Sequence, residues 1–407
     1  MGRTTVGEFV RALFLSLPLH GHTNPALPLV RELTRGGDEV IGYSNSWFAE
    51  KIAQAGAAYR AYRYAGLAEM KRLPERMEEL SVLLMQATAG TLRMQLDEWR
   101  ALKPDYLIAD SVAPWGHWAG KLLEVPVVTS VPTLAINRHV MSYGLARGVR
   151  PKSAASFFAK LRNLVKASGI RRQIRREFQV DGPGVMASIS GKSGLNIVYT
   201  SRHFQPCEAS FDATFHFIGP SVAERAETVD FPWERVRARR VVYISMGTLF
   251  NENAAFYRTC YQALGAEDCQ VILSTGGNVA LADLGAAPDN FIIRPYVPQL
   301  EVLSLAAAFV SHGGMNSVNE SLMYGVPLVV IPQMGEQHIN GRRVEELGAG
   351  LVLSNAEAGP ARLRHSVRRL LDDAQFRQGA AGVRESYANA GGVARAAGLI
   401  RAFTRPA

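Results

Sequence analysis

The sequence has few cysteines and no long hydrophobic run. Its three cysteines in 407 residues show no metal-ligand spacing, which favours a reducing compartment over a disulfide framework. The longest apolar runs, such as Val326–Ile331, are far shorter than the roughly 20 residues needed to cross a bilayer. Phe9–Leu17 is apolar but contains Arg11 and lacks a small-residue cleavage site, so it predicts a strand and not a signal peptide. These absences predict a cytoplasmic protein.

Motifs typical of metal sites are missing as well. The chain has no Asp-x-Asp pair and no His-x-x-x-His arrangement with a nearby Glu, so we expect no metal in its site. Disorder is excluded, because 47% of the residues are apolar and only 20% are charged. At one domain per ~150 residues, the length predicts two or three domains, and we take two.

Acidic residues are absent between Arg147 and Arg176, although the whole chain has a net charge of only +9. This stretch contains ten cations: Arg147, Arg150, Lys152, Lys160, Arg162, Lys166, Arg171, Arg172, Arg175 and Arg176. Apolar residues within it recur at helical spacing, at Phe157, Phe158, Leu161, Leu164 and Val165. A solvated helix face over a packed core is the first interpretation, and an anionic membrane surface is the second. Nucleic acid is not expected, because no nucleic-acid-binding motif accompanies the charge.

Short apolar runs alternate with longer helical patterns in both halves of the sequence, which predicts an α/β protein with two parallel sheets flanked by helices. In the first half the predicted strands are Phe9–Leu17, Glu39–Tyr43, Tyr106–Asp110, Val125–Ser130 and Asn196–Thr200, with a helix over Pro25–Arg35. In the second half they are Val241–Ser245, Gln270–Ser274, Asn290–Arg294, Ala308–Ser311 and Leu328–Ile331, with a last strand near Leu351.

The segment 219–240 separates these two series. It is mixed in charge, contains Pro220 and Pro232, and shows no clear period, which is typical of a linker. We therefore predict domains at 1–218 and 241–407, with a terminal helix over about 392–403.

Two histidines follow the first predicted strand, and an aspartate closes another. His20 and His22 precede Pro25, and Asp110 ends the strand that begins at Tyr106. Because the carboxyl ends of parallel strands share one edge of a sheet, His22 and Asp110 could form a general base and its orienting carboxylate. A histidine that caps a turn and an aspartate that starts a helix are the alternative.

Small residues follow two strands of the second half. Ser245, Gly247 and Thr248 come after one, and a segment from His312 to Ser317 leads from another into a predicted helix that contains Glu320. Glycines there let backbone N–H groups approach an anion at the helix N-terminus, so we predict that both loops bind a diphosphate. After a third strand, Glu336 and Gln337 offer an acid and an amide suited to binding several hydroxyls.

With these motifs, the sequence resembles the UDP-dependent glycosyltransferases of GT-B fold, most of all the bacterial macrolide and natural-product subfamily. The resemblance covers essentially the whole chain. It rests on the GHxxP-like start at Gly21–Pro25 and on YVPQLEVL, SHGGMNSVNESL, YGVPLVVIPQ and EQ, which occur in order between Tyr296 and Gln337. It implies two Rossmann-like domains that face each other across a cleft, with the terminal helix crossing back onto the first domain.

The resemblance also implies a role for each matching residue. His22 would be the catalytic base and Asp110 its partner. The donor would be bound by Tyr296, Val297 and Gln299 at the uracil and ribose, by Glu320 at the ribose hydroxyls, by His312, Gly314, Asn316 and Ser317 at the diphosphate, and by Glu336 and Gln337 at the sugar.

Two positions depart from the family pattern. Tyr296 stands where many relatives have Trp, which makes the stacking platform smaller. Glu336 stands where Asp is usual, and its longer side chain leaves the identity of the donor sugar undetermined. Glucose is the leading candidate, because Gln337 is retained.

The expected activity is therefore metal-independent, inverting transfer of a hexose from a UDP-sugar to a hydroxyl of a hydrophobic molecule such as a macrolide, flavonoid or other phenol. No cofactor is expected besides the UDP-sugar substrate. Apolar stretches at Leu80–Met94 and Phe157–Val165 would be walls for such an acceptor. A monomer or homodimer is expected.

Three alternatives stay open. The acceptor could be a lipid or amphiphile that approaches along residues 147–176 at a membrane surface. A UDP-N-acetylhexosamine 2-epimerase type of isomerase would use the same two domains without an acceptor pocket. A lipid-binding protein that has lost catalysis is the third, and the presence of His22, Asp110 and Glu320 argues against it.

Overall fold

The computed structural model describes residues 10–70, 73–74, 76–145, 154–191, 193–222, 231–237, 239–247, 253–277 and 279–404. The chain divides into two compact units, each built on one sheet. The first unit comprises 1–200, 207–223 and 391–407, and the second comprises 201–206 and 224–390.

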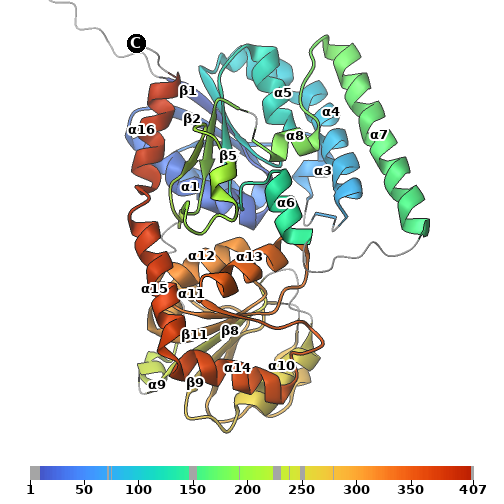
Figure 1. Cartoon of the computed structure of the whole chain (residues 1–407). Helices are drawn as coiled ribbons and strands as arrows, with labels where there is room; N and C mark the ends of the chain where they lie inside the picture. The colour runs from blue at the N-terminus through green and yellow to red at the C-terminus, as the bar shows by residue number, and fades with distance from the viewer. Residues whose placement is uncertain are drawn as a thin grey trace, which may run out of the picture. The chain divides into compact units, whose positions relative to one another are not determined.

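The sheet of the first unit is parallel throughout and has the strand order β3-β2-β1-β4-β5-β6-β7 (Figure 1). Its strands are β1 (Arg11–Leu15), β2 (Glu39–Ser44), β3 (Ala58–Ala61), β4 (Tyr106–Asp110), β5 (Val127–Val131), β6 (Leu195–Val198) and β7 (Phe215–Phe217). Helices α1 (His20–Arg35), α2 (Ala49–Gln54), α3 (Ala65–Ala68), α4 (Met77–Leu102), α5 (Pro114–Leu123), α6 (Arg138–Leu145), α7 (Ala154–Phe178), α8 (Val185–Ile189) and α16 (Gly392–Thr404), with 3₁₀ turns at Ser46–Phe48 and Glu208–Ser210, complete this unit.

Two apolar clusters cover the two faces of this sheet. Leu13 and Leu107 point to one face and meet helices α4 and α5, where Trp99 and Trp115 are fully buried. Phe14 and its neighbours point to the other face, against α1 and α16. Alternate residues of each strand thus enter opposite layers, because strand side chains have a period of two. Burial on both faces explains why these strands are apolar runs without polar alternation.

The second unit repeats this architecture with the parallel strand order β10-β9-β8-β11-β12-β13. Its strands are β8 (Val241–Ser245), β9 (Gln270–Ser274), β10 (Phe291–Arg294), β11 (Ala306–Ser311), β12 (Leu328–Val330) and β13 (Gly350–Val352). Its helices are α9 (Trp233–Arg237), α10 (Ala254–Leu264), α11 (Gln299–Leu305), α12 (Met315–Met323), α13 (Gly335–Glu346), α14 (Pro360–Asp372) and α15 (Ala374–Ala388), with a 3₁₀ turn at Leu281–Leu284. The predicted fold class, α/β with two doubly wound parallel sheets, is confirmed.

The first helix begins earlier than its prolines indicate. We predicted a start at Pro25, but α1 begins at His20 and contains Pro25 within it. The hydroxyl of Thr23 does not cap the helix, because it donates to the backbone oxygen of Leu17 at 3.0 Å. This correction places His22 inside the first turn of a helix and not in a loop.

Two edge strands, β3 and β7, were not predicted. The β3 sequence AYRA has no buried residue, and the β7 sequence FHF is only three residues long. Neither is an apolar run long enough to predict a strand, whereas β10, an edge strand of the second sheet, has the apolar run FIIR and was predicted.

The two units exchange segments of chain. The terminal helix α16 belongs to the first unit, where Ala396, Ala397 and Ile400 are buried in the core against α1. Residues 201–206, in contrast, belong to the second unit: the guanidinium of Arg343 donates to the backbone oxygens of His203 and Phe204 at 2.6 and 3.0 Å. The segment predicted as a linker, 219–240, contains α9 and the buried Phe231, and 224 onward belongs to the second unit.

Candidate active site

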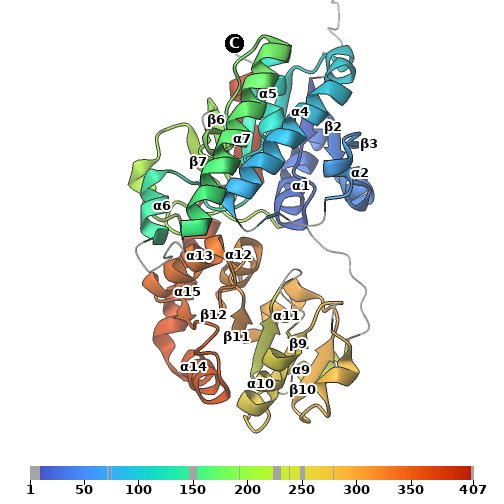
Figure 2. The same ribbon diagram turned by 90° about the vertical axis from the view of Figure 1, so that its right-hand side faces the viewer.

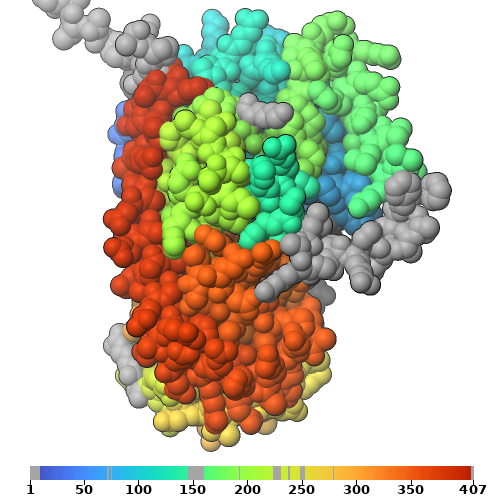
Figure 3. Space-filling view, viewed as in Figure 1, coloured from blue at the N-terminus to red at the C-terminus, as the bar shows by residue number. Residues whose placement is uncertain are grey.

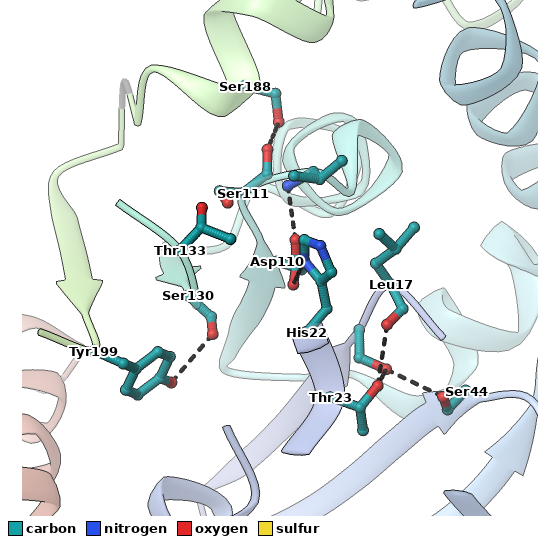
Figure 4. A network of polar contacts seen from close by, with 12 residues as sticks. Leu17, His22, Thr23, Ser44, Asp110, Ser111, Ser130, Thr133, Ser188 and Tyr199 are labelled. Carbon is teal, nitrogen blue, oxygen red and sulfur yellow. Dashed lines mark hydrogen bonds and ion pairs between the residues drawn. The ribbon is translucent and has the colours of Figure 1, made fainter. Parts of the chain in front are cut away.

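His22 and Asp110 meet at the carboxyl edge of the first sheet. Nδ1 of His22 lies 2.9 Å from Oδ2 of Asp110, although the two residues are 88 positions apart (Figure 4). The two residues follow neighbouring strands, since β1 pairs with β4. The contact brings the two side chains together, as a base and its orienting carboxylate require.

The carboxylate is held in place independently of the histidine. Oδ1 of Asp110 accepts from the backbone N–H of Val112 at 2.7 Å, and the side chain is almost completely buried. Its second oxygen is thereby aimed at His22. An ionised carboxylate only accepts hydrogen bonds, so the Nδ1 atom of His22 carries a proton and Nε2 is left as the acceptor. That is the tautomer a general base requires.

Polar residues of neighbouring strands surround this pair (Figure 4). The hydroxyl of Ser130, which stands opposite Asp110 in the register of β5, donates to Oη of Tyr199 at 3.1 Å. On the other side, Ser188 donates to the backbone oxygen of Ser111 at 3.0 Å. These hydrogen bonds join the ends of β5 and β6 to each other and α8 to the end of β4, and they restrict the movement of these segments.

His117 on α5 is a third titratable group near this pair, and no sequence motif indicates it. Burial lowers the pKa of its imidazole to about 4, although the charge of Asp110 acts in the opposite direction. Its Nε2 has no hydrogen-bond partner among the described residues. The side chain is therefore neutral near pH 7 and adds no positive charge beside Asp110.

In the second unit, the turn between β11 and α12 has the shape of an anion-binding loop. Gly313 has a φ of +82°, and a Cβ atom there would lie 2.5 Å from a methyl carbon of Val330. Asn340 on α13 donates to the backbone oxygen of Gly313 at 2.9 Å, which we did not predict from sequence. Asn340 thereby fixes the carbonyl of Gly313. The N–H groups in the first turn of α12 have no acceptor within the helix, so they are available to a ligand.

The predicted diphosphate residues lie around this turn. Gly314 is the N-cap of α12, and Asn316 and Ser317 are in its first turn. Gly247, after β8, has a φ of +76°, and a Cβ atom there would lie 2.6 Å from Cε1 of His312. The predicted residue Thr248 lies outside the described residues, whereas Ser245 ends β8 and its hydroxyl accepts from the N–H of Gly247 at 3.4 Å.

His312 is enclosed by these glycines. A Cβ atom at Gly314 would lie 2.5 Å from its Nε2, so any larger residue there would displace the ring. Burial lowers the pKa of His312 to about 4, against the opposite effect of a hydrogen bond with the Ser245 backbone. The ring is therefore neutral, and its buried Nδ1 atom lies beside the loop without a partner among the described residues.

The predicted nucleoside residues form a hydrogen-bonded chain. Nε2 of Gln299 donates to Oε2 of Glu320 at 2.5 Å, and its Oε1 accepts from the hydroxyl of Tyr243 at 2.9 Å. The amide of Gln299 is thus oriented by Tyr243 and in turn holds the buried carboxylate of Glu320. Beside them, Val297 is buried, whereas Tyr296 is 65% exposed and offers a ring face to a base.

The two predicted sugar-binding residues differ in their surroundings. Gln337 is buried, and its Oε1 accepts from the backbone N–H groups of Gln333 and Met334 at 2.8 and 3.2 Å. Only its amide nitrogen is left for a ligand. Glu336, one residue earlier in α13, is exposed.

Comparisons with known proteins identify the family. Residues 258–394 match the family described as Erythromycin biosynthesis protein CIII-like, C-terminal domain. The UDP-glucosyltransferase YojK of Bacillus subtilis, described as uncharacterized, is 30% identical to this chain over 95% of the chain and 96% of its own length. The chain belongs to the macrolide and natural-product glycosyltransferases.

Two further matches agree with this identification. The demethyllactenocin mycarosyltransferase of Streptomyces fradiae is 31% identical over 99% of this chain and 91% of its own. A crystal structure of the kitacinnamycin glycosyltransferase superimposes with a TM-score of 0.83 at 26% identity, covering 97% of this chain and 98% of that one. The glycosyltransferase is thus a sugar-transferring enzyme of GT-B fold, and the isomerase alternative is set aside.

Proposed function

We propose that this glycosyltransferase transfers glucose from UDP-glucose to a hydroxyl group of a hydrophobic natural product, with inversion at the anomeric carbon and without a metal. The observation that supports this most directly is the 2.9 Å contact between His22 and Asp110, which leaves Nε2 of His22 as a proton acceptor. A histidine in this state can deprotonate a hydroxyl as it attacks.

The reaction would take place in one displacement step. The acceptor oxygen forms a bond to the anomeric carbon as its proton passes to Nε2 of His22, and the bond from that carbon to the UDP oxygen breaks. Because the nucleophile attacks opposite the leaving group, the configuration inverts. The carboxylate of Asp110 is already oriented by the N–H of Val112, and its negative charge stabilises the imidazolium that forms.

Negative charge then develops on the departing diphosphate. In this proposal it is stabilised by N–H groups at the start of α12, by the helix dipole, and by the hydroxyl of Ser317. These donors stand in a turn whose shape depends on Gly313 and on Asn340, so they need little reorganisation during the reaction. A preorganised set of dipoles supplies the stabilisation that a divalent cation provides in other transferases.

The choice of UDP-glucose rests on two features. Relatives such as YojK carry a UDP-glucosyltransferase description, and Gln337 is retained at the expected sugar position. The mycarosyltransferase among the relatives shows that donors differ within the family. Glu336 is exposed and longer than the usual Asp, so it is the residue on which we expect the choice of sugar to depend.

The first test is UDP release from UDP-glucose with a panel of macrolides, flavonoids and simple phenols, with and without EDTA. We expect acceptor-dependent release that EDTA does not change, and a β-linked product from the α-linked donor by NMR. dTDP-glucose and UDP-galactose in parallel assays test the base and the sugar separately.

Each part of the proposal can fail by itself. Release that EDTA abolishes contradicts the metal-free mechanism, and an α-linked product contradicts inversion. Transfer from dTDP-glucose alone contradicts the choice of uridine but leaves the family assignment intact.

A further inference from the structure

The outward face of α7 is apolar in one half and cationic in the other. Leu161, Leu164 and Val165 are 50%, 52% and 58% exposed, which is unusual for aliphatic side chains at adjacent helical positions. They are spaced i, i+3 and i+4, so they form one patch. We predicted the apolar positions of this helix as the face over a packed core, and for these three residues that prediction is wrong.

The helix packs through a different side, which lies roughly 120–180° around the axis from Leu161 and Val165 but only about 60–80° from Leu164. Ala167 and Ile174 are buried against the α4 layer of the first unit. Ala167 and Ile174 thus pack into the core, while the three residues of the patch stay about half exposed.

The same outward face continues into positive charge. Arg172, Arg175 and Arg176 are exposed and lie within about 60° of the direction of Leu161. Lys160, Arg162 and Lys166 are exposed beside the apolar patch. Arg171, in contrast, forms an ion pair with Asp181 at 3.0 Å, because this acidic residue is within its reach. For the other six cations, no ion pair is formed with any residue that the structure describes.

The helix lies at the outside of the first unit. Figure 2 shows α7 as the foremost helix of that unit, with α4 beside it, and Figure 3 shows its surface at the edge of the same unit. The other predicted members of the patch and of the charge run, Phe157, Phe158, Arg147, Arg150 and Lys152, lie outside the residues whose side chains are described, and the argument does not use them.

We infer that α7 docks the protein on an anionic membrane surface, with Leu161, Leu164 and Val165 inserted among the lipids and the cations over the headgroups. The positive charge of this face favours an anionic membrane surface. Acidic residues are absent from 147–176, and the cations surround the apolar patch on the sides and at one end. None of the described helices is long and apolar enough to span a bilayer, so the contact is peripheral.

The experiment is cosedimentation of the full chain with vesicles of phosphatidylcholine alone and of phosphatidylcholine mixed with phosphatidylglycerol. We expect binding to the anionic vesicles at low salt, at least 10-fold weaker binding to neutral vesicles, and loss of binding at high salt. Binding is measured without substrates, so its outcome does not depend on the proposed reaction.

Two variants test the two halves of the face. Leu164→Glu with Val165→Glu should reduce binding at least 10-fold, and Arg175→Gln with Arg176→Gln should reduce it several-fold. Leu305→Glu is the matched control, because Leu305 is also an exposed leucine on a helix, at 41%, but belongs to the second unit. All of these side chains are exposed, so an unchanged melting temperature confirms folding.

Three results would overturn the inference. The first is absence of binding at low salt, or equal binding to neutral and anionic vesicles. The second is a dimer in size-exclusion chromatography that Val165→Glu converts to a monomer, which would assign the face to a second copy of this chain. The third is a raised KM for a dissolved acceptor in the Leu164→Glu variant without vesicle binding, which would make the patch an acceptor wall.

Discussion

Each unit of this glycosyltransferase has a histidine just beyond a central strand, and the two have opposite surroundings. His22, after β1, lies 2.9 Å from the buried carboxylate of Asp110. His312, after β11, lies between Gly247 and Gly314, with its pKa lowered by burial to about 4. The position of a histidine after a central strand therefore does not by itself determine whether its ring can accept a proton.

Because their surroundings differ, His22 can accept a proton, whereas His312 is a neutral hydrogen-bonding group. A carboxylate beside His22 stabilises the imidazolium, so the ring can take up a proton during a reaction. No carboxylate contributes to the pKa shift of His312, and its enclosure by glycines opposes protonation. A neutral ring next to a diphosphate can hold it by a hydrogen bond but does not remove the proton of an acceptor.

The largest effect is expected from His22→Ala. Loss of a general base lowers the rate about 10²- to 10⁴-fold, whereas the proposed UDP site is in the second unit, so the affinity for UDP should be unchanged. Steady-state UDP release and calorimetric titration with UDP measure the two quantities. His20→Ala is the control, because that ring packs against Phe48 at the same turn. Parallel loss of transfer and UDP affinity would contradict the division of roles between the units.

Asp110→Asn tests the electrostatic half of the same pair. The amide nitrogen would donate toward Nδ1 of His22 and move the ring proton to Nε2, which removes the acceptor atom. We expect kcat to fall about 10²-fold, with little change in the melting temperature, since the side-chain oxygen can still accept from Val112. A kcat within about twofold of the natural enzyme would show that the carboxylate does not orient the base.

Gly247→Ala tests the enclosure of His312. The added Cβ would lie 2.6 Å from the ring at a φ of +76°, a strain of about 1–3 kcal/mol, so UDP affinity should fall about 10-fold or more. Gly359→Ala is the matched control, because Gly359 has a negative φ and open space in the same unit. Normal UDP affinity in Gly247→Ala would place the diphosphate away from this loop.

The smallest effect concerns stability in acid. The pKa of His312 is about 4 in the folded chain and 6.5 in the unfolded chain, so the unfolded state binds more protons in this interval. Unfolding free energy should therefore fall as the pH drops from 6.5 toward 4, by up to about 3 kcal/mol for this group.

Urea unfolding of the natural chain and of His312→Asn at pH 7, 5.5 and 4.5 measures this contribution. The variant should lose less stability on acidification than the natural chain, although it starts from a lower value. His365→Asn, at an exposed histidine of α14, is the control. An identical acid dependence in the natural chain and in His312→Asn would show that burial does not hold His312 neutral.

Local pattern was sufficient for most of the central strands. The predicted bounds of β4, β8 and β9 agree with the structure, because a strand buried on both faces is a continuous apolar run that ends where polar residues begin. The edge strands β3 and β7 and the start of α1 were missed. β3 has no buried residue and β7 has only three residues, so neither shows such a run. The prolines of α1 lie inside a helix whose first turn is joined through Thr23 to Leu17, just after β1.

By itself, the sequence determined the two parallel sheets, the strand ends that carry His22, Asp110 and His312, and the motifs that identify a glycosyltransferase. Only the tertiary structure decided that His22 contacts Asp110, that Gln299 holds Glu320 and that Asn340 supports the loop at Gly313. It also decided that Leu161, Leu164 and Val165 of α7 are exposed. The reason is physical: periodicity and turn residues record local conformation, whereas pairing across 88 residues and the burial of one helix face depend on what packs against it.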